Sequence, residues 1–219
     1  MKKKILCLLL LVALLLSAAT TVTAFEKRTR TVGSTVAVRV TDDDENGLAL
    51  RFTAPLSRLE YDRIAAIYGA DRLSVGVLVA PLVCVEKANG VFTRDALSSM
   101  VSDYCDNANA SAYIDIRSNG FYQISDRVLT VAGSVYNFSS ATRKYNPAFV
   151  VVAYIDVDTN GDTVADLTFY GDYDLNECYR VKDTMLRARA QMTESQKLWI
   201  TALLETFDSE ANPREDDYR

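Results

Sequence analysis

Apolar and polar residues alternate in the first two segments that the chain predicts as strands. Residues 35–40 (TVAVRV) and 48–53 (LALRFT) place apolar side chains at every second position. A period of two is typical of antiparallel strands with one buried face. The polar residues 41–47 between them predict a turn.

A helix is predicted next, at about residues 57–69. Ser57 and Glu60 have the spacing of a capping box, and Gly69 suits the end of a helix. Apolar residues recur at helical spacing and predict one face packed on the core: Tyr61, Ile64, Ala65 and Tyr68.

The middle of the chain predicts further strands and one short helix. A strand is predicted at residues 73–83, with Pro81 marking its end. Thr93 is expected to cap a helix with Leu97, Met100 and Val101 on one face. More strands are expected near residues 111–117, 120–124 and 127–137.

A central strand is predicted at residues 148–157 (AFVVVAYIDV), because this segment is apolar on both faces. Residues 163–171 are expected to pair back with it as a hairpin, through a turn that contains Asn160 and Gly161.

Two helices are predicted at residues 176–208. Asn176 is expected to cap the first, and Thr193 and Gln196 form a capping box for the second. The expected apolar faces are Val181, Met185 and Ala188, and then Trp199, Ala202, Leu203 and Phe207. The sequence therefore predicts an α+β protein, mainly an antiparallel β-sandwich with an inserted helix (57–69) and a C-terminal helical pair (176–208).

The N-terminus has the composition of a secretory signal peptide. Three lysines precede an apolar run, Ile5 to Leu16, and small or polar residues lead to Ala24. A membrane anchor is the alternative, but a spanning helix needs about 20 apolar residues. The predicted organisation is a signal peptide (1–24), a β-sandwich module (33–172), a helical appendage (173–208) and a flexible tail (209–219). The mature protein is expected to be secreted, with no membrane span after cleavage.

The balance of charge favours some partners over others. The formal net charge is −5, and signal cleavage would remove three lysines and make the chain more acidic. An acidic protein is poorly suited to bind nucleic acid or an anionic membrane. It is compatible with cation binding.

Three cysteines would remain after cleavage: Cys84, Cys105 and Cys178. Cys84 and Cys105 flank a predicted turn and helix, and they form the favoured disulfide if any pair forms in an oxidising compartment. The alternative is that all three are small buried apolar residues.

Residues 47–81 carry a pattern that extends further along the chain. Its elements are Gly47, Arg51-Phe52-Thr53, Tyr61-Asp62, Tyr68-Gly69-Ala70-Asp71 and Gly76, followed by Phe92-Thr93, Ala96-Leu97, Gly133-Ser134-Val135, Asn137 and Ala153-Tyr154-Ile155. Over about residues 33–172 this order resembles an uncharacterised β-rich module of exported or surface proteins of Gram-positive gut bacteria. The resemblance implies an accessory extracellular module, and it supplies no catalytic residues.

The chain contains no histidine, which excludes Ser-His-Asp and Cys-His catalysis and histidine-ligated zinc. Hydrolysis of a glycan by two carboxylates needs no histidine and stays an alternative. The first hypothesis is a non-catalytic secreted module that binds a surface polymer or protein. The second is a secreted, carboxylate-dependent glycan hydrolase.

One segment suggests a metal. Oxygen-bearing side chains recur around the glycine turn in residues 156–167: Asp156, Asp158, Asn160, Asp162 and Asp166. Calcium prefers six to eight oxygen ligands, so the spacing suggests a calcium loop. Leu167 stands where an EF-hand has its bidentate glutamate. The alternative is a hairpin turn with solvated acids.

Signal cleavage can be measured directly. We expect the exported protein to begin at Phe25, because the small residues Val22 and Ala24 occupy the −3 and −1 positions. N-terminal sequencing and intact mass would check this, and a mature chain that keeps Met1 would contradict it.

Overall fold

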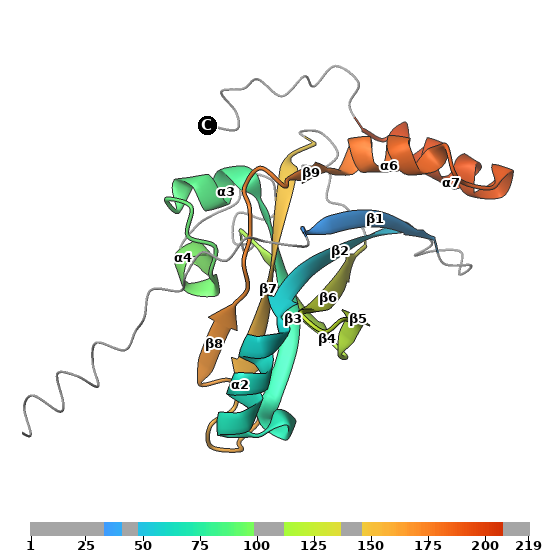
Figure 1. The fold of residues 1–219 in the computed structure, drawn as a ribbon. Coiled ribbons are helices and arrows are strands. Elements are labelled where there is room, and N and C mark those ends of the chain that lie inside the picture. Colours follow the sequence, from blue (N-terminus) through green and yellow to red (C-terminus); the bar gives the residue numbers. More distant parts are fainter. Residues whose placement is uncertain (1–32, 41–47, 99–111, 137–145, 208–219) are drawn as a thin grey trace, which may run out of the picture. The chain divides into compact units, whose positions relative to one another are not determined.

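A computed structural model describes residues 33–40, 48–98, 112–136 and 146–207 (Figure 1). The predicted signal peptide (1–24), the turn at 41–47, Met100, Val101, Cys105 and the tail (209–219) lie outside these ranges.

Two antiparallel sheets form the framework. One sheet has the strand order β1 (Thr35–Val40), β2 (Leu48–Ser57), β6 (Val128–Val135) and β5 (Phe121–Ile124). The other has the order β4 (Ile114–Ser118), β3 (Leu73–Pro81), β7 (Ala148–Val157) and β8 (Leu167–Tyr170), and β9 (Tyr179–Arg180) also pairs with β7. Their packing against each other confirms the predicted α+β, sandwich-like fold.

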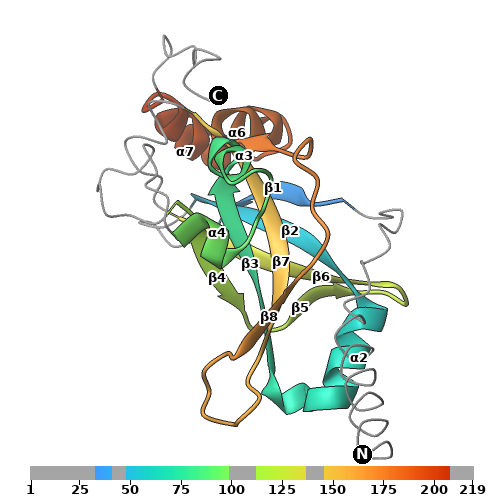
Figure 2. The same ribbon diagram turned by 90° about the vertical axis from the view of Figure 1, so that its left-hand side faces the viewer.

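Helices cover parts of both sheets. They are α2 (Arg58–Tyr68), the 3-10 helix η1 (Ala70–Arg72), α3 (Leu82–Lys87), α4 (Arg94–Ser98), α6 (Val181–Arg189) and α7 (Glu194–Leu204) (Figure 2). Within the described ranges, every helix is too short or too polar to cross a lipid bilayer.

The central strand β7 is buried along its whole length, as its two apolar faces predict. Its odd-numbered residues, such as Val151 and Ile155, pack in the core between the two sheets. Its even-numbered residues, such as Val152 and Tyr154, pack with Phe92 in a second core under α3 and α4. One strand therefore belongs to both cores.

The helix α2 forms as predicted. The Ser57 hydroxyl accepts a hydrogen bond from the Glu60 amide at 3.4 Å, and Gly69 follows the helix with a positive φ of 94°. Tyr61, Ile64 and Tyr68 lie against the core. The predicted N-cap of α4 is also confirmed, because the Ala96 amide donates to the Thr93 hydroxyl.

Two boundaries near the sheet differ from the prediction. The strand β3 ends at Pro81, and residues 82–83 begin helix α3, which the sequence did not indicate. A short apolar run has no distinguishing period, so its secondary structure is decided by packing. The strand β8 starts at Leu167, later than predicted, because residues 158–166 form the connection.

The C-terminal helices also differ in detail. Helix α6 begins at Val181 and not near Asn176, because β9 first pairs with β7. The capping box of Thr193 and Gln196 is confirmed. On α7 it is Ile200 that is fully buried, whereas Ala202 is exposed. Leu203 and Phe207 of the predicted face do pack on the main core, so this face is confirmed in part.

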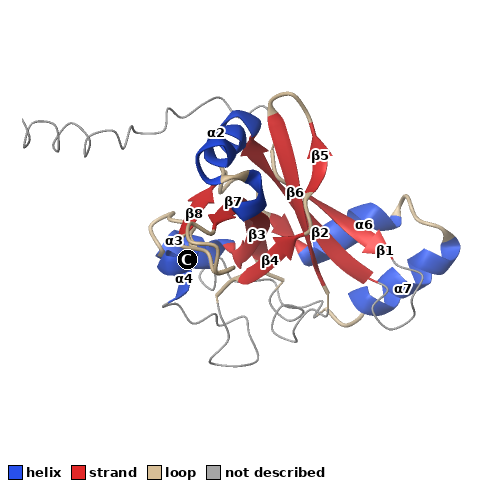
Figure 3. Ribbon diagram, turned by 90° about the horizontal axis from the view of Figure 1, so that it is seen from below, coloured by secondary structure: helices blue, strands red, loops and turns tan. Residues whose placement is uncertain are grey.

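Residues 173–207 contribute to the core of the strands. Val181, Met185 and Ile200 are fully buried in the same cluster as β2 and β7. Helices α6 and α7 contact each other, and α6 contacts β1 (Figure 3). The segment predicted as an appendage therefore completes the main core.

Gly133 on β6 lies at a close approach of the two sheets. A Cβ atom there would come within 2.5 Å of Val77 Cγ2 and 2.9 Å of Ile116 Cβ. Only a residue without a side chain fits between strands at this distance.

We expect Gly133→Ala to lower the free energy of unfolding by roughly 1–3 kcal/mol, because the new methyl group overpacks the interface between the sheets. Urea denaturation would measure the loss. Ser134→Ala is the matched control on the same strand, and we expect its effect to stay within about 0.5 kcal/mol because that side chain points to the other face. Equal effects of the two substitutions would contradict the assignment.

Candidate functional site

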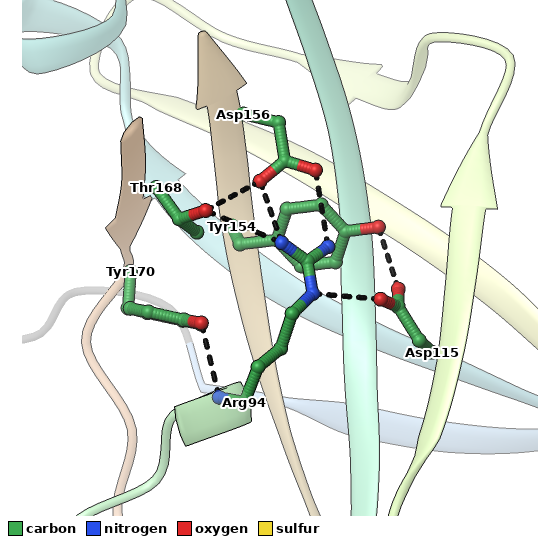
Figure 4. A network of polar contacts seen from close by, with 6 residues as sticks. All are labelled: Arg94, Asp115, Tyr154, Asp156, Thr168 and Tyr170. Atoms are coloured by element: carbon green, nitrogen blue, oxygen red, sulfur yellow. Dashed lines mark hydrogen bonds and ion pairs between the residues drawn. The ribbon is translucent and has the colours of Figure 1, made fainter. Parts of the chain in front are cut away.

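A cluster of charged and hydroxyl side chains lies on the face of the five-stranded sheet that α4 covers (Figure 4). We call it the Arg94 cluster. Its members are Arg94 on α4, Asp115 on β4, Tyr154 and Asp156 on β7, and Thr168 and Tyr170 on β8. Four elements that are distant in sequence therefore meet at one guanidinium group.

Asp156 explains why the cluster exists. It is the one acid in a strand that is otherwise apolar, and its side chain is 3% exposed. A buried carboxylate is strongly unfavourable without a partner. Arg94 donates to both of its oxygens, from Nη1 at 2.7 Å and from Nη2 at 3.1 Å. The Thr168 hydroxyl donates a further hydrogen bond at 2.7 Å.

Asp115 completes the coordination of the guanidinium. Arg94 Nε donates to Asp115 Oδ2 at 2.7 Å, and the Tyr154 hydroxyl donates to Asp115 Oδ1 at 2.7 Å. The guanidinium carbon lies 4.0 Å from the centre of the Tyr154 ring, a cation–π distance. The backbone amide of Arg94 donates to the Tyr170 hydroxyl at 3.0 Å.

A glycine makes the contact between Tyr154 and Asp115 possible. Gly76 on β3 lies between β7 and β4 and pairs with Tyr154 and with Arg117. A Cβ at Gly76 would come within 2.2 Å of the Tyr154 hydroxyl oxygen. The tyrosine ring therefore lies across the glycine and reaches the neighbouring strand.

Burial and neighbouring charges shift the pKa values of three groups in the cluster. Burial alone would lower the pKa of Arg94, but hydrogen bonds and charge from Asp156 and Asp115 outweigh it and raise the pKa far above its ordinary value. Burial raises the pKa of Tyr154 strongly, and the hydrogen bond to Asp115 adds to this. Burial also raises the pKa of Tyr170. At neutral pH the Arg94 guanidinium is thus charged, and the hydroxyls of Tyr154 and Tyr170 keep their protons.

The residues predicted as calcium ligands do not all come together. Asp156 belongs to the Arg94 cluster, where Arg94 and Thr168 engage its carboxylate. The other four lie in the connection 158–166, where their oxygens accept hydrogen bonds from the loop. Within the described part of the chain, no three acidic or cysteine side chains are arranged to hold a metal ion.

Asp158 organises that loop. Its carboxylate accepts hydrogen bonds from the amides of Gly161 at 2.5 Å and Thr163 at 2.8 Å. Partial desolvation opposes ionisation, but these amides outweigh it and hold the pKa of Asp158 below its ordinary value. Asp166 accepts from the amide and hydroxyl of Thr159, which lowers its pKa too. These contacts account for the acids of a hairpin turn, and calcium binding stays a prediction.

The cysteine prediction also stays open. Cys84 is buried on α3, Cys178 is half-buried before β9, and Cys105 lies outside the described residues.

Sequence reasoning missed most of the Arg94 cluster. The available signal was Asp156 itself, because an acid within a fully apolar strand requires a cationic partner. Nothing in the sequence identified Arg94 as that partner among 24 lysines and arginines. Comparisons with protein-family models, with curated proteins and with solved structures found no match for this chain.

We expect Arg94→Met to lower the free energy of unfolding by about 3–5 kcal/mol, because it leaves the Asp156 carboxylate buried without its cation. Asp115→Asn is the comparison: its side chain is 36% exposed, so we expect a loss of no more than about 1 kcal/mol. Urea denaturation of both variants, and of the double variant Arg94→Met with Asp156→Leu, would test this. A double variant no more stable than Arg94→Met would contradict the buried-charge explanation.

Calcium binding is tested by thermal unfolding. If the loop binds calcium, titration into chelator-treated protein raises the melting temperature, because the ion binds only the folded state. Asp162→Ala should then abolish the shift. No shift at millimolar calcium, or the same shift in the variant, would leave only the hairpin turn.

Proposed function

We propose that this protein is a secreted, non-catalytic module that binds a surface polymer or protein through the outer face of its four-stranded sheet. The observation that carries the proposal is two tyrosine–arginine pairs on that face. Tyr122 on the edge strand β5 is 52% exposed, and the Arg51 guanidinium lies 5.0 Å from the centre of its ring. Farther along the sheet, Arg39 donates to the Tyr136 hydroxyl at 3.3 Å.

The register places the two arginines on one side of the sheet. Arg51 pairs with Ala37 on β1 and with Ser134 on β6, and Arg39 pairs with Ala49. The neighbours of Arg51 in sequence, Leu50 and Phe52, point into the core. Side chains alternate along a strand, so Arg39 and Arg51 both face outward.

The composition of this face suits recognition. The strands β1, β2, β5 and β6 contain no aspartate or glutamate, although the chain as a whole is acidic. Tyrosine and arginine, with tryptophan, are enriched among the residues that dominate protein binding surfaces, because a ring supplies apolar area and a guanidinium supplies several hydrogen-bond donors.

The Arg94 cluster supports a non-catalytic role. Its two carboxylates are held by the same guanidinium, and neither is placed as an unpartnered acid or base. Carboxylate-dependent hydrolysis needs one carboxyl group that can give up a proton and one that is free to act as base or nucleophile.

A glycan array probed with the full secreted chain would test the binding role. We expect Tyr122→Ala to lose retention of any bound glycan and Tyr122→Phe to keep it, because stacking needs only the ring. Leu198→Ala removes another exposed apolar side chain, on α7, and serves as the control. Glycan binding that survives Tyr122→Ala would contradict the assignment to this face. Release of new reducing ends from a glycan would favour the hydrolase alternative.

A further inference from the structure

Three Asn-Gly pairs lie in described turns of the chain: Asn89–Gly90, Asn119–Gly120 and Asn160–Gly161. This dipeptide can cyclise, because the glycine has no Cβ to hinder the attack of its backbone nitrogen on the asparagine side-chain carbonyl carbon. The nitrogen can attack only when its N–H is not engaged elsewhere. The three glycine amides differ in whether their N–H has a hydrogen-bond acceptor.

Two of the pairs are protected. The Gly90 amide donates to the Val85 carbonyl at 2.9 Å, as part of the end of α3. The Gly161 amide donates to the Asp158 carboxylate at 2.5 Å, and a nearby negative charge disfavours loss of its proton. The Asn160 side chain is also held, because its Oδ1 accepts from the Asp162 amide at 2.9 Å.

Asn119–Gly120 is not protected in this way. It lies in the exposed connection that leaves β4 in one sheet and enters β5 in the other. The Gly120 amide has no hydrogen-bond acceptor among the described residues. Asn119 and Gly120 are both exposed, and a Cβ built on Gly120 (φ 142°) would meet no atom within 4 Å, so the glycine is not packed against the sheets.

We propose that Asn119 is a site of spontaneous deamidation. The Gly120 nitrogen loses its proton to solvent base and bonds to Asn119 Cγ, and the side-chain amide leaves as ammonia. Water then opens the resulting succinimide at either carbonyl and gives aspartate or isoaspartate. The reaction consumes one water, releases one ammonia and needs no oxidant or reductant. It adds a negative charge to the connection between the sheets, and in the isoaspartate form it adds a methylene group to the backbone.

The rates at the three sites test the proposal. The full chain is incubated at mildly alkaline pH, digested with trypsin and analysed by mass spectrometry. The tryptic sites after Lys87, Arg117 and Lys144 place Asn89, Asn119 and Asn160 in separate peptides. We expect Asn119 to convert roughly tenfold to hundredfold faster than the other two, because their amides must first break a hydrogen bond. In urea the three rates should converge.

A variant separates protection from local sequence. Asp158→Ala removes the acceptor of the Gly161 amide and should speed the conversion of Asn160 while Asn119 is unchanged. Asn89 reports on unfolding, because its rate would rise too if the variant had lost its fold. Asn119→Gln should abolish the fast conversion. Equal rates at Asn119 and Asn160 in the folded protein would overturn the proposal.

Discussion

Burial of β7 on both faces is the constraint on which the rest of the structure depends. A strand without an exposed face needs a layer on each side, and here the four-stranded sheet supplies one and α3 with α4 supplies the other. The strand also needs neighbours along both edges, which are β3 on one side and β8 with β9 on the other. The C-terminal segment is therefore tied to the same core, because β9 leads directly into α6.

The carboxylate of Asp156 is the exception within this apolar strand, and its neutralisation organises one end of the fold. Thr93 caps the start of α4, and Arg94, the first residue of that helix, reaches Asp156 from there. Tyr154 can join them only because Gly76 leaves room for its ring. Loss of Arg94 would leave the buried Asp156 carboxylate without its cation and is strongly destabilising, yet a well-packed apolar set could replace the pair. The network holds side chains of α4, β4, β7 and β8 together at one guanidinium group.

We propose that binding takes place on the other sheet, at the outer face of the four-stranded sheet. There the strands carry tyrosine and arginine and no acids, and the edge strand β5 leaves Tyr122 exposed. The connection from β4 to β5 joins the two sheets and carries the unprotected Asn119–Gly120 pair.

The sequence by itself determined the features that depend on neighbouring residues. The period of two placed β1 and β2, the caps at Ser57 and Thr193 placed α2 and α7, and unbroken apolarity identified β7 as central. It could not determine which of many cations meets Asp156, where α6 begins, or that Ile200 faces the core. Those depend on contacts between residues far apart in the chain, which only tertiary packing brings together. The spacing of the acids at 156–166 suits both a calcium loop and a turn that is held by its own hydrogen bonds. The tertiary structure separates Asp156 from the others, because its carboxylate is paired with the guanidinium of Arg94.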